Sequence, residues 1–241
     1  MKVLAIDTSN QPLLVALADD HNIVGSFQTD KPKNHSVDLL PAVRHLLSEQ
    51  GVFLSDIDQI AVAKGPGSFT GLRIGITVGK VLADTLKKPL YAISSLQALA
   101  KQVQLEKQEK AIVLAMFDAR NDNVFAGAYL ADKPVLEDGH YPIDEVLLLI
   151  AQMNEPVIVV GDGAHFEEKI EEELGRQPLT ILSRDESLPT GVGLVNLVDD
   201  STLVTDVANL TPAYLRKTQA ELNWEQKQQG KPLDKPYVFE V

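Results

Sequence analysis

Five of the 15 glycines lie within residues 65–79, where an apolar run expected to form a strand leads into a predicted helix. Gly65, Gly67 and Ser68 open this segment, and backbone N–H groups at the start of a helix favour anions. These three residues are therefore candidate nucleotide or phosphate ligands. The spacing matches neither a Walker A loop nor G-x-G-x-x-G, because three residues separate Gly67 from Gly71. Spacing alone thus leaves the chemistry of this segment open.

Two aspartates, Asp7 and Asp118, each end an apolar run, one in each half of the chain. Ligands of α/β proteins bind outside the carboxyl ends of strands, so both residues are candidates for binding a metal ion or a phosphate-bound water in a shared cleft. The alternative is that each side chain stabilises a hairpin turn.

Other patterns that could carry catalysis do not occur in the sequence. The chain has five histidines and no cysteine, and no two histidines have the i, i+4 spacing of a helical metal site. Neither H-E-x-x-H nor G-x-S-x-G is present. We therefore predict no catalytic residue and, apart from the two candidate aspartates, no metal site.

Gly71, Gly75 and Gly79 recur every four residues and form a smooth stripe along the predicted helix. Each glycine inside a helix costs about 1 kcal/mol relative to alanine. The other faces of this helix are mostly apolar, which is typical of a helix buried on several sides. We therefore expect the helix to meet its own sheet and something else. Two explanations remain open for the second contact: the stripe packs against the preceding helix of the same chain, or it forms a protein–protein interface.

These residues are set among regularly spaced elements. Periodicity and turn signals predict strands at residues 3–6, 13–17, 23–27, 60–63 and 90–93, with helices at about 36–50 and 69–86.

From residue 111 the same pattern begins again. Residues 113–118 repeat residues 3–7, and residues 124–130 follow them as residues 13–17 follow the first run. A helix at about 144–151, a strand at 157–160 and a helix at about 165–174 complete the second unit. The repetition predicts an α/β fold made of duplicated units, each a β-hairpin plus βα, with coincidence as the alternative.

The net charge of −12 is confined to one stretch, since residues 137–200 hold 15 acidic and three basic side chains. Such a chain lacks the basic surface of an autonomous nucleic-acid-binding protein and is repelled by anionic membranes. No run approaches the ~20 apolar residues of a membrane span, and the first acidic residue comes too early for a signal peptide. We expect a soluble cytoplasmic protein.

The string GPGSFTGLRIG at residues 65–75, after KVLAIDTS at residues 2–9, resembles the TsaB (YeaZ) family, which is related to TsaD and the M22 glycoprotease-like proteins. Further matches are His35-Ser36, Leu39-Leu40-Pro41, Asp118-Ala119-Arg120 and the PAYLR of residues 212–216. The resemblance implies a two-lobed, actin/Hsp70-like (ASKHA) fold with mixed sheets. The expected lobes are residues 1–100 and an acidic lobe at 101–241, in which the residues from about 206 onward form a polar helix or tail able to pack back across both lobes.

The family works in the synthesis of N6-threonylcarbamoyladenosine in tRNA. TsaD carries an H-x-x-x-H metal motif, whereas residues 94–100 here contain no histidine, and no glycine follows Asp7. The resemblance therefore implies a non-catalytic subunit that activates TsaD, with no stably bound cofactor and with ATP or ADP as a candidate ligand at the TsaD interface. The alternatives are an autonomous ATP-using enzyme or peptidase, and a self-associating protein with an unrelated partner.

The implied partners are TsaD, TsaE through the complex, and a second copy of this chain, with tRNA bound only within the complex and its basic surface supplied by the partners. In the family, helices of the first lobe form the contacts with TsaD and with a second copy. Carried over to this sequence, the interface residues are Leu39, Leu40, Val43, Leu46, Leu47, Thr70, Gly71, Arg73, Ile74, Gly75 and Val78.

Overall fold

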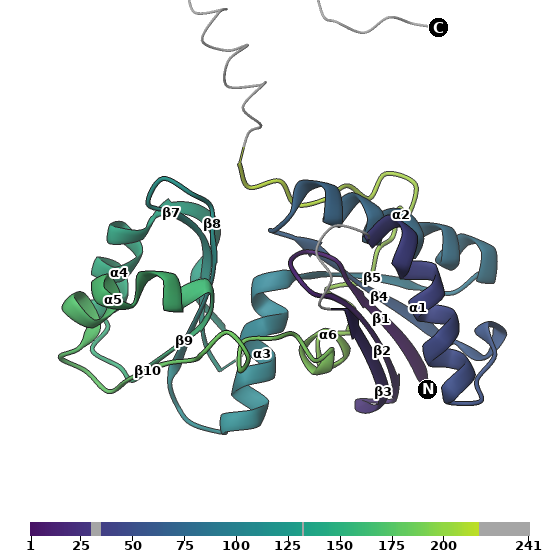
Figure 1. Cartoon of the computed structure of the whole chain (residues 1–241), viewed down its shortest axis with the longest axis horizontal. Coiled ribbons are helices and arrows are strands. Elements are labelled where there is room, and N and C mark those ends of the chain that lie inside the picture. The colour runs from purple at the N-terminus through teal and green to yellow at the C-terminus, as the bar shows by residue number, and fades with distance from the viewer. Residues whose placement is uncertain (30–34, 132, 217–241) are drawn as a thin grey trace, which may run out of the picture.

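The computed structural model describes residues 1–29, 35–131 and 133–216, which form two lobes side by side (Figure 1). The first lobe is built on a five-stranded sheet in the order β3-β2-β1-β4-β5. The first three strands form an antiparallel meander, and β4 and β5 run parallel to β1. Their bounds are β1 (Lys2–Asp7), β2 (Leu13–Asp19), β3 (Asn22–Thr29), β4 (Gln59–Gly65) and β5 (Leu90–Ser94).

The second lobe repeats this topology. Its sheet has the order β10-β9-β6-β7-β8, so that β6 takes the place of β1, with an antiparallel neighbour on one side and a parallel neighbour on the other. The strands are β6 (Ile112–Asp118), β7 (Asn123–Leu130), β8 (Lys133–Pro142), β9 (Val157–Gly161) and β10 (Leu179–Ile181). The predicted α/β fold of two similar units with mixed sheets is confirmed.

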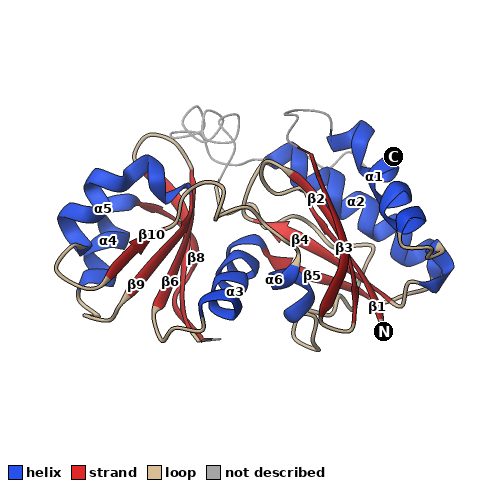
Figure 2. Cartoon of the chain, turned by 60° about the horizontal axis from the view of Figure 1, so that its bottom comes forward, coloured by secondary structure: helices blue, strands red, loops and turns tan. Residues whose placement is uncertain are grey.

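Helices cover the outer face of each sheet and fill the space between the sheets (Figures 1 and 2). The outer helices are α1 (His35–Glu49) and α2 (Phe69–Leu86) on the first lobe, and α4 (Ile143–Ala151) and α5 (Glu167–Leu174) on the second. The helices α3 (Ser95–Lys107) and α6 (Val192–Asn196) lie between the sheets, and short 3-10 helices occupy η1 (Leu54–Asp56) and η2 (Asp162–Phe166). Of the helices in the described ranges, none is both long and apolar enough to cross a membrane.

Both faces of each sheet are buried, which explains why the central strands are continuously apolar. One core cluster joins the first sheet to α1 and α2, and another joins its opposite face to α3 and α6. Two further clusters lie on the two faces of the second sheet.

The chain returns to the first lobe after β10. Leu203 pairs with Tyr91 of β5 in an antiparallel bridge, and the Ala213 N–H donates to the Lys64 carbonyl of β4 at 2.7 Å. The range 101–241 expected for the second lobe therefore includes residues that pack on the first lobe. The chain already reaches the first lobe at α6, before residue 206. The boundary expected at residue 100 falls inside α3, and the tail at 217–241 lies outside the described residues.

Candidate functional site

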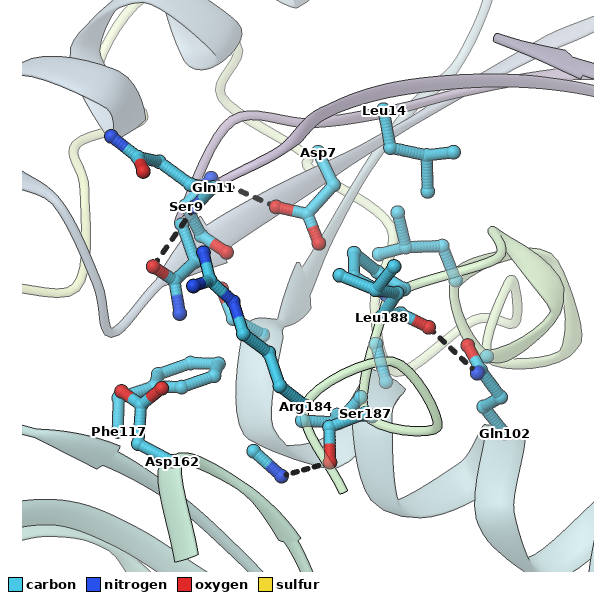
Figure 3. A pocket seen from close by; sticks show the side chains of 18 of the residues that line it. Asp7, Ser9, Gln11, Leu14, Gln102, Phe117, Asp162, Arg184, Ser187 and Leu188 are labelled. Carbon is cyan, nitrogen blue, oxygen red and sulfur yellow. Dashed lines mark hydrogen bonds between the residues drawn. The ribbon is translucent and has the colours of Figure 1, made fainter. Parts of the chain in front are cut away.

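A cavity of about 190 Å³ lies between the two lobes. Its walls come from the turn after β1, one face of α3, the end of β9 and the loop that leads from β10 to α6 (Figure 3). Binding pockets for drug-sized ligands usually measure about 300–1,000 Å³, so this cavity suits a smaller molecule.

Asp7 reaches this cavity from the end of β1. Its side chain is only 5% exposed, and its Oδ1 accepts a hydrogen bond from the Ser9 N–H at 2.8 Å. Burial raises the pKa of the Asp7 carboxyl, against the opposing effects of the Ser9 hydrogen bonding and of His35. Burial lowers the pKa of His35.

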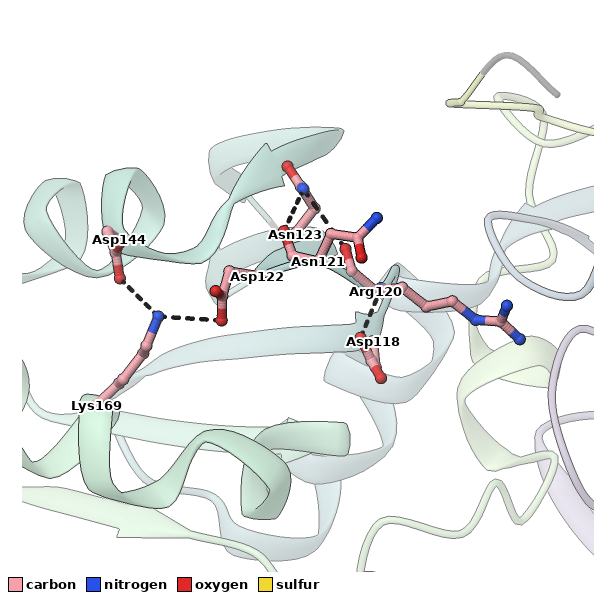
Figure 4. A network of polar contacts seen from close by, with 7 residues as sticks. All are labelled: Asp118, Arg120, Asn121, Asp122, Asn123, Asp144 and Lys169. Carbon is pink, nitrogen blue, oxygen red and sulfur yellow. Dashed lines mark hydrogen bonds and ion pairs between the residues drawn. The ribbon is translucent and has the colours of Figure 1, made fainter. Parts of the chain in front are cut away.

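Asp118 occupies the equivalent position at the end of β6 but is exposed and does not line the cavity. Its Oδ1 accepts from the Arg120 N–H at 2.7 Å, which is the same turn that Asp7 makes. Arg120 begins a run of three residues with positive φ, and Lys169 ties the turn down through Asp122 and Asp144 (Figure 4). Of the two aspartates only Asp7 therefore lines this cavity, and Asp118 forms the turn that the alternative describes.

The glycine stripe faces the first lobe's own sheet and not the preceding helix. A Cβ at Gly71 would overlap the Thr8 carbonyl oxygen, and a Cβ at Gly75 would overlap the Thr8 hydroxyl, which donates to the Gly71 carbonyl at 2.8 Å. A Cβ at Gly79 would overlap Val62 of β4. The stripe thus lets α2 lie directly on the β1–β2 turn and the first sheet, as expected for a helix that meets its own sheet.

The candidate phosphate residues are not brought together. Gly65 lines a second cavity between the lobes, beside Ser94 and Asp138. Ser68 caps α2 by accepting from the Gly71 N–H at 3.3 Å, while its own N–H donates to the Ser9 carbonyl at 2.6 Å. The Ser68 N–H is therefore occupied within the chain, and Gly67 packs against the same Ser9 backbone.

The predicted interface residues divide into two groups. Six are buried within the first lobe, and their assignment to a partner interface stays a prediction: Leu39, Val43, Leu46, Leu47, Gly71 and Gly75. The other five are exposed or half-buried on the outer surface of α1 and α2: Leu40, Thr70, Arg73, Ile74 and Val78. Amphipathic spacing identified the helices but did not separate their inner from their outer faces.

The sequence predicted that residues from about 206 onward could pack back across the lobes, but it did not indicate their contacts with α2. Tyr214 stacks on Phe69, with 4.6 Å between ring centroids, and its hydroxyl accepts from the Arg73 Nε–H at 2.7 Å. Arg216 then donates to the Ala119 carbonyl of the second lobe at 2.6 Å. We call residues 211–216 the strap, since they join α2 to the opposite lobe.

Sequence reasoning also missed two polar residues of the cavity, Ser95 and Arg184. Arg184 is one of three basic residues in the acidic stretch 137–200, and that isolation could have singled it out. Ser95 carried no comparable signal.

Comparison with known proteins identifies the family. The family model described as "TsaD: tRNA N6-adenosine threonylcarbamoyltransferase" matches residues 28–167. The "tRNA threonylcarbamoyladenosine biosynthesis protein TsaB" of Bacillus subtilis (strain 168) is 34% identical over 234 residues, which covers 95% of this chain and 100% of that protein. The chain belongs to the TsaB family.

Solved structures agree with the TsaB assignment. YeaZ from Pseudomonas aeruginosa matches with a TM-score of 0.73 and 32% identity, over 89% of this chain and 99% of that one. ROK hexokinase from Thermus thermophilus matches with a TM-score of 0.52 and 13% identity, over 81% of this chain and 96% of that one, which shows a shared fold alone. Within the described residues of this TsaB-family chain, no three His, Asp or Glu side chains are grouped to hold a metal ion.

Proposed function

We propose that this chain is a non-catalytic subunit of the machinery that forms N6-threonylcarbamoyladenosine in tRNA. Its similarity to TsaB along the whole length of that protein supports a role in this modification. In the proposal the chain binds and activates TsaD, which transfers threonylcarbamoyl from threonylcarbamoyl-AMP to the tRNA adenosine 3′ of the anticodon. This chain itself matches the TsaD family model, which supports the proposal that it pairs with a partner of similar fold.

The main support for a partner-binding surface on the first lobe is the exposed apolar side of α1. Leu40 is 55% exposed and Val37 lies one helical turn before it. Leu40 also lines a shallow hollow with Pro41, Arg44 and the residues that follow on the same helix. Large apolar side chains clustered on one surface are typical of protein-binding sites.

The exposed part of α2 extends this surface, because α1 and α2 lie next to each other on the same face of the sheet (Figure 1). Thr70, Ile74, Val78 and Val81 present their exposed atoms there. Arg73 takes part through its contacts with the strap, so the strap forms one border of the proposed surface.

The remaining parts of the proposal concern ligands and assembly. No cofactor is bound stably by this chain, and ATP or ADP binds, if at all, at the interface with TsaD. A second copy of the chain competes for the same surface, TsaE joins through the complex, and tRNA binds only within the complex. The acidic stretch 137–200 supports this last point, since it would repel the tRNA phosphates. The proposed location is the cytoplasm.

Leu40→Glu tests the surface, and Leu148→Glu on α4 is a matched control, because Leu148 is 52% exposed on the second lobe. Affinity for TsaD is measured by isothermal titration calorimetry, with thermal unfolding as a check on folding. A charge in the centre of an apolar interface typically costs about 2 kcal/mol or more. We expect at least about tenfold weaker binding for Leu40→Glu and unchanged binding for Leu148→Glu.

A reconstituted tRNA-modification assay tests the activity itself. Omission of this chain should abolish or strongly reduce modification, and Leu40→Glu should restore it poorly. Full modification without the chain would contradict the proposal. Turnover of ATP or a peptide by the isolated chain at ordinary enzymatic rates would favour the autonomous enzyme instead.

A further inference from the structure

The cavity between the lobes plays no part in the proposed contact with TsaD, and its polar groups are not all satisfied. Ser95, the first residue of α3, lines the cavity and is 3% exposed. Among the described residues its hydroxyl has no hydrogen-bond partner. Since a buried polar group without a partner costs about 1–3 kcal/mol, an orphaned hydroxyl at a cavity wall indicates a missing ligand or water.

A solvent-exposed arginine from the opposite lobe also lines the cavity. Arg184 follows β10 and extends toward Ser9 and Gln11 of the first lobe (Figure 3). In the described part of the chain its guanidinium makes neither an ion pair nor a hydrogen bond. Guanidinium groups bind carboxylates through paired N–H donors, so Arg184 supplies a site for an anionic group.

The first lobe supplies the opposite charge. Asp7 is buried at the cavity wall, where its carboxyl group accepts hydrogen bonds from the backbone N–H and the side chain of Ser9. Asp7 and Arg184 line the same cavity but do not form an ion pair with each other. A molecule lying between them therefore meets a carboxylate on one side and a guanidinium on the other.

We propose that the cavity binds a small zwitterion of the α-amino acid class, with its carboxylate on Arg184, its ammonium on Asp7 and a hydrogen bond to the Ser95 hydroxyl. The size agrees, because about 190 Å³ holds about six water molecules at ~30 Å³ each. The apolar part of the wall, which includes Leu14 and Phe117, lies against the aliphatic part of the ligand.

A phosphate-bearing ligand fits this cavity less well. Asp162 also lines it, so two carboxylates stand against one guanidinium. The Asp162 carboxylate is oriented by the Asp118 N–H, which donates to its Oδ2 at 2.9 Å. An added polyanion would be repelled by both carboxylates, whereas a zwitterion carries a positive group to offset Asp7.

The test measures binding of glycine, L-serine and L-threonine to the isolated full-length chain, by thermal shift and calorimetry. We expect at least one of the three to bind with millimolar or better affinity, and propionate or ethylamine, which carry one charge each, to bind at least about tenfold more weakly. Arg184→Gln should weaken binding by about tenfold or more. Ser95→Ala should weaken it less, and Arg176→Gln, an exposed arginine outside the cavity, should leave it unchanged.

Two results would overturn the assignment. The first is that none of the three amino acids binds at a ligand concentration 20-fold above ~1 mM. The second is that an amino acid binds and Arg184→Gln leaves its affinity unchanged. Because the assay uses this chain without TsaD or tRNA, its failure would not bear on the proposed role in tRNA modification.

Discussion

The Ser94 hydroxyl at the end of β5 donates a hydrogen bond to the Asp138 carboxylate on β8, and this contact joins the first sheet to the second. The same carboxylate accepts from the buried Tyr129 hydroxyl. Burial and the charge of Asp138 raise the pKa of Tyr129, so the phenol remains a donor across the neutral range. The relative position of the lobes is therefore held by a polar contact as well as by α3.

Asp138→Ala should destabilise the protein by about 1–3 kcal/mol, because it leaves the buried Tyr129 hydroxyl without its acceptor. Urea denaturation measures the free energy of unfolding. Asp144→Ala is the control, since the exposed ion pair of Asp144 with Lys169 should contribute less than about 1 kcal/mol. If both variants lost the same free energy of unfolding, the Ser94–Asp138–Tyr129 contact would contribute no more to stability than an exposed ion pair.

Gly71→Ala should destabilise the protein by about 1–3 kcal/mol, although alanine favours an isolated helix by about 1 kcal/mol. The reversal of sign follows from the overlap of the new methyl group with the Thr8 carbonyl oxygen, which belongs to backbone and cannot turn away. Thr77→Ala, at an exposed site on the same helix, should be neutral or slightly stabilising. A more stable Gly71→Ala variant would mean that the close approach of α2 to the turn is not required.

Asp7→Asn should leave the protein equally stable or more stable at pH 7. The amide oxygen can still accept from the Ser9 N–H, while the buried charge is removed. Because the folded-state pKa of Asp7 is raised, its contribution to stability is fully present below the unfolded pKa of about 4 and is lost as the pH rises through the folded pKa. The advantage of the variant should therefore shrink as the pH falls toward 4.

Asp118→Asn serves as the control substitution, because Asp118 makes the same turn on the surface. Its substitution should change the free energy of unfolding little between pH 4 and 7. If Asp7→Asn lost stability at pH 7, the ionised carboxylate would be making a favourable contact that outweighs its burial.

Tyr214→Phe and Tyr214→Ala separate the two contacts that fix the strap on α2. Phenylalanine keeps the stack on Phe69 and loses only the hydrogen bond to Arg73, whereas alanine loses both. We expect losses below about 1 kcal/mol for phenylalanine and about 1–2 kcal/mol for alanine. Hydrogen exchange at residues 211–216 should accelerate in the same order, and identical exchange in both variants would show that the stack contributes nothing.

Local patterns in the sequence were sufficient to predict the strands on either side of Asp7 and Asp118, because apolar runs ending in turn residues are local features. The strand β8 and helix α3 were not predicted. The strand β8 carries Glu137, Asp138 and Gly139 in its middle, a composition that does not favour strands, and it forms by pairing with β7.

The site was predicted less completely than the fold. The contacts of Gly71 with Thr8 and of Arg216 with Ala119 join positions 63 and 97 residues apart, and no local pattern encodes such pairs. The sequence identified the glycine stripe as a place of close approach but gave no information about what approaches it.

The return of residues 202–210 to the first lobe affects the order in which the protein can be completed. Val204, Val207 and Leu210 belong to the first core, and Leu203 covers the open edge of β5. The second sheet, by contrast, is made entirely of residues 112–181. During synthesis on the ribosome the first lobe emerges first but is completed last. A chain that stalled after β10 would contain every strand of the second sheet, while the first lobe would still lack the residues that complete its core and cover the edge of β5.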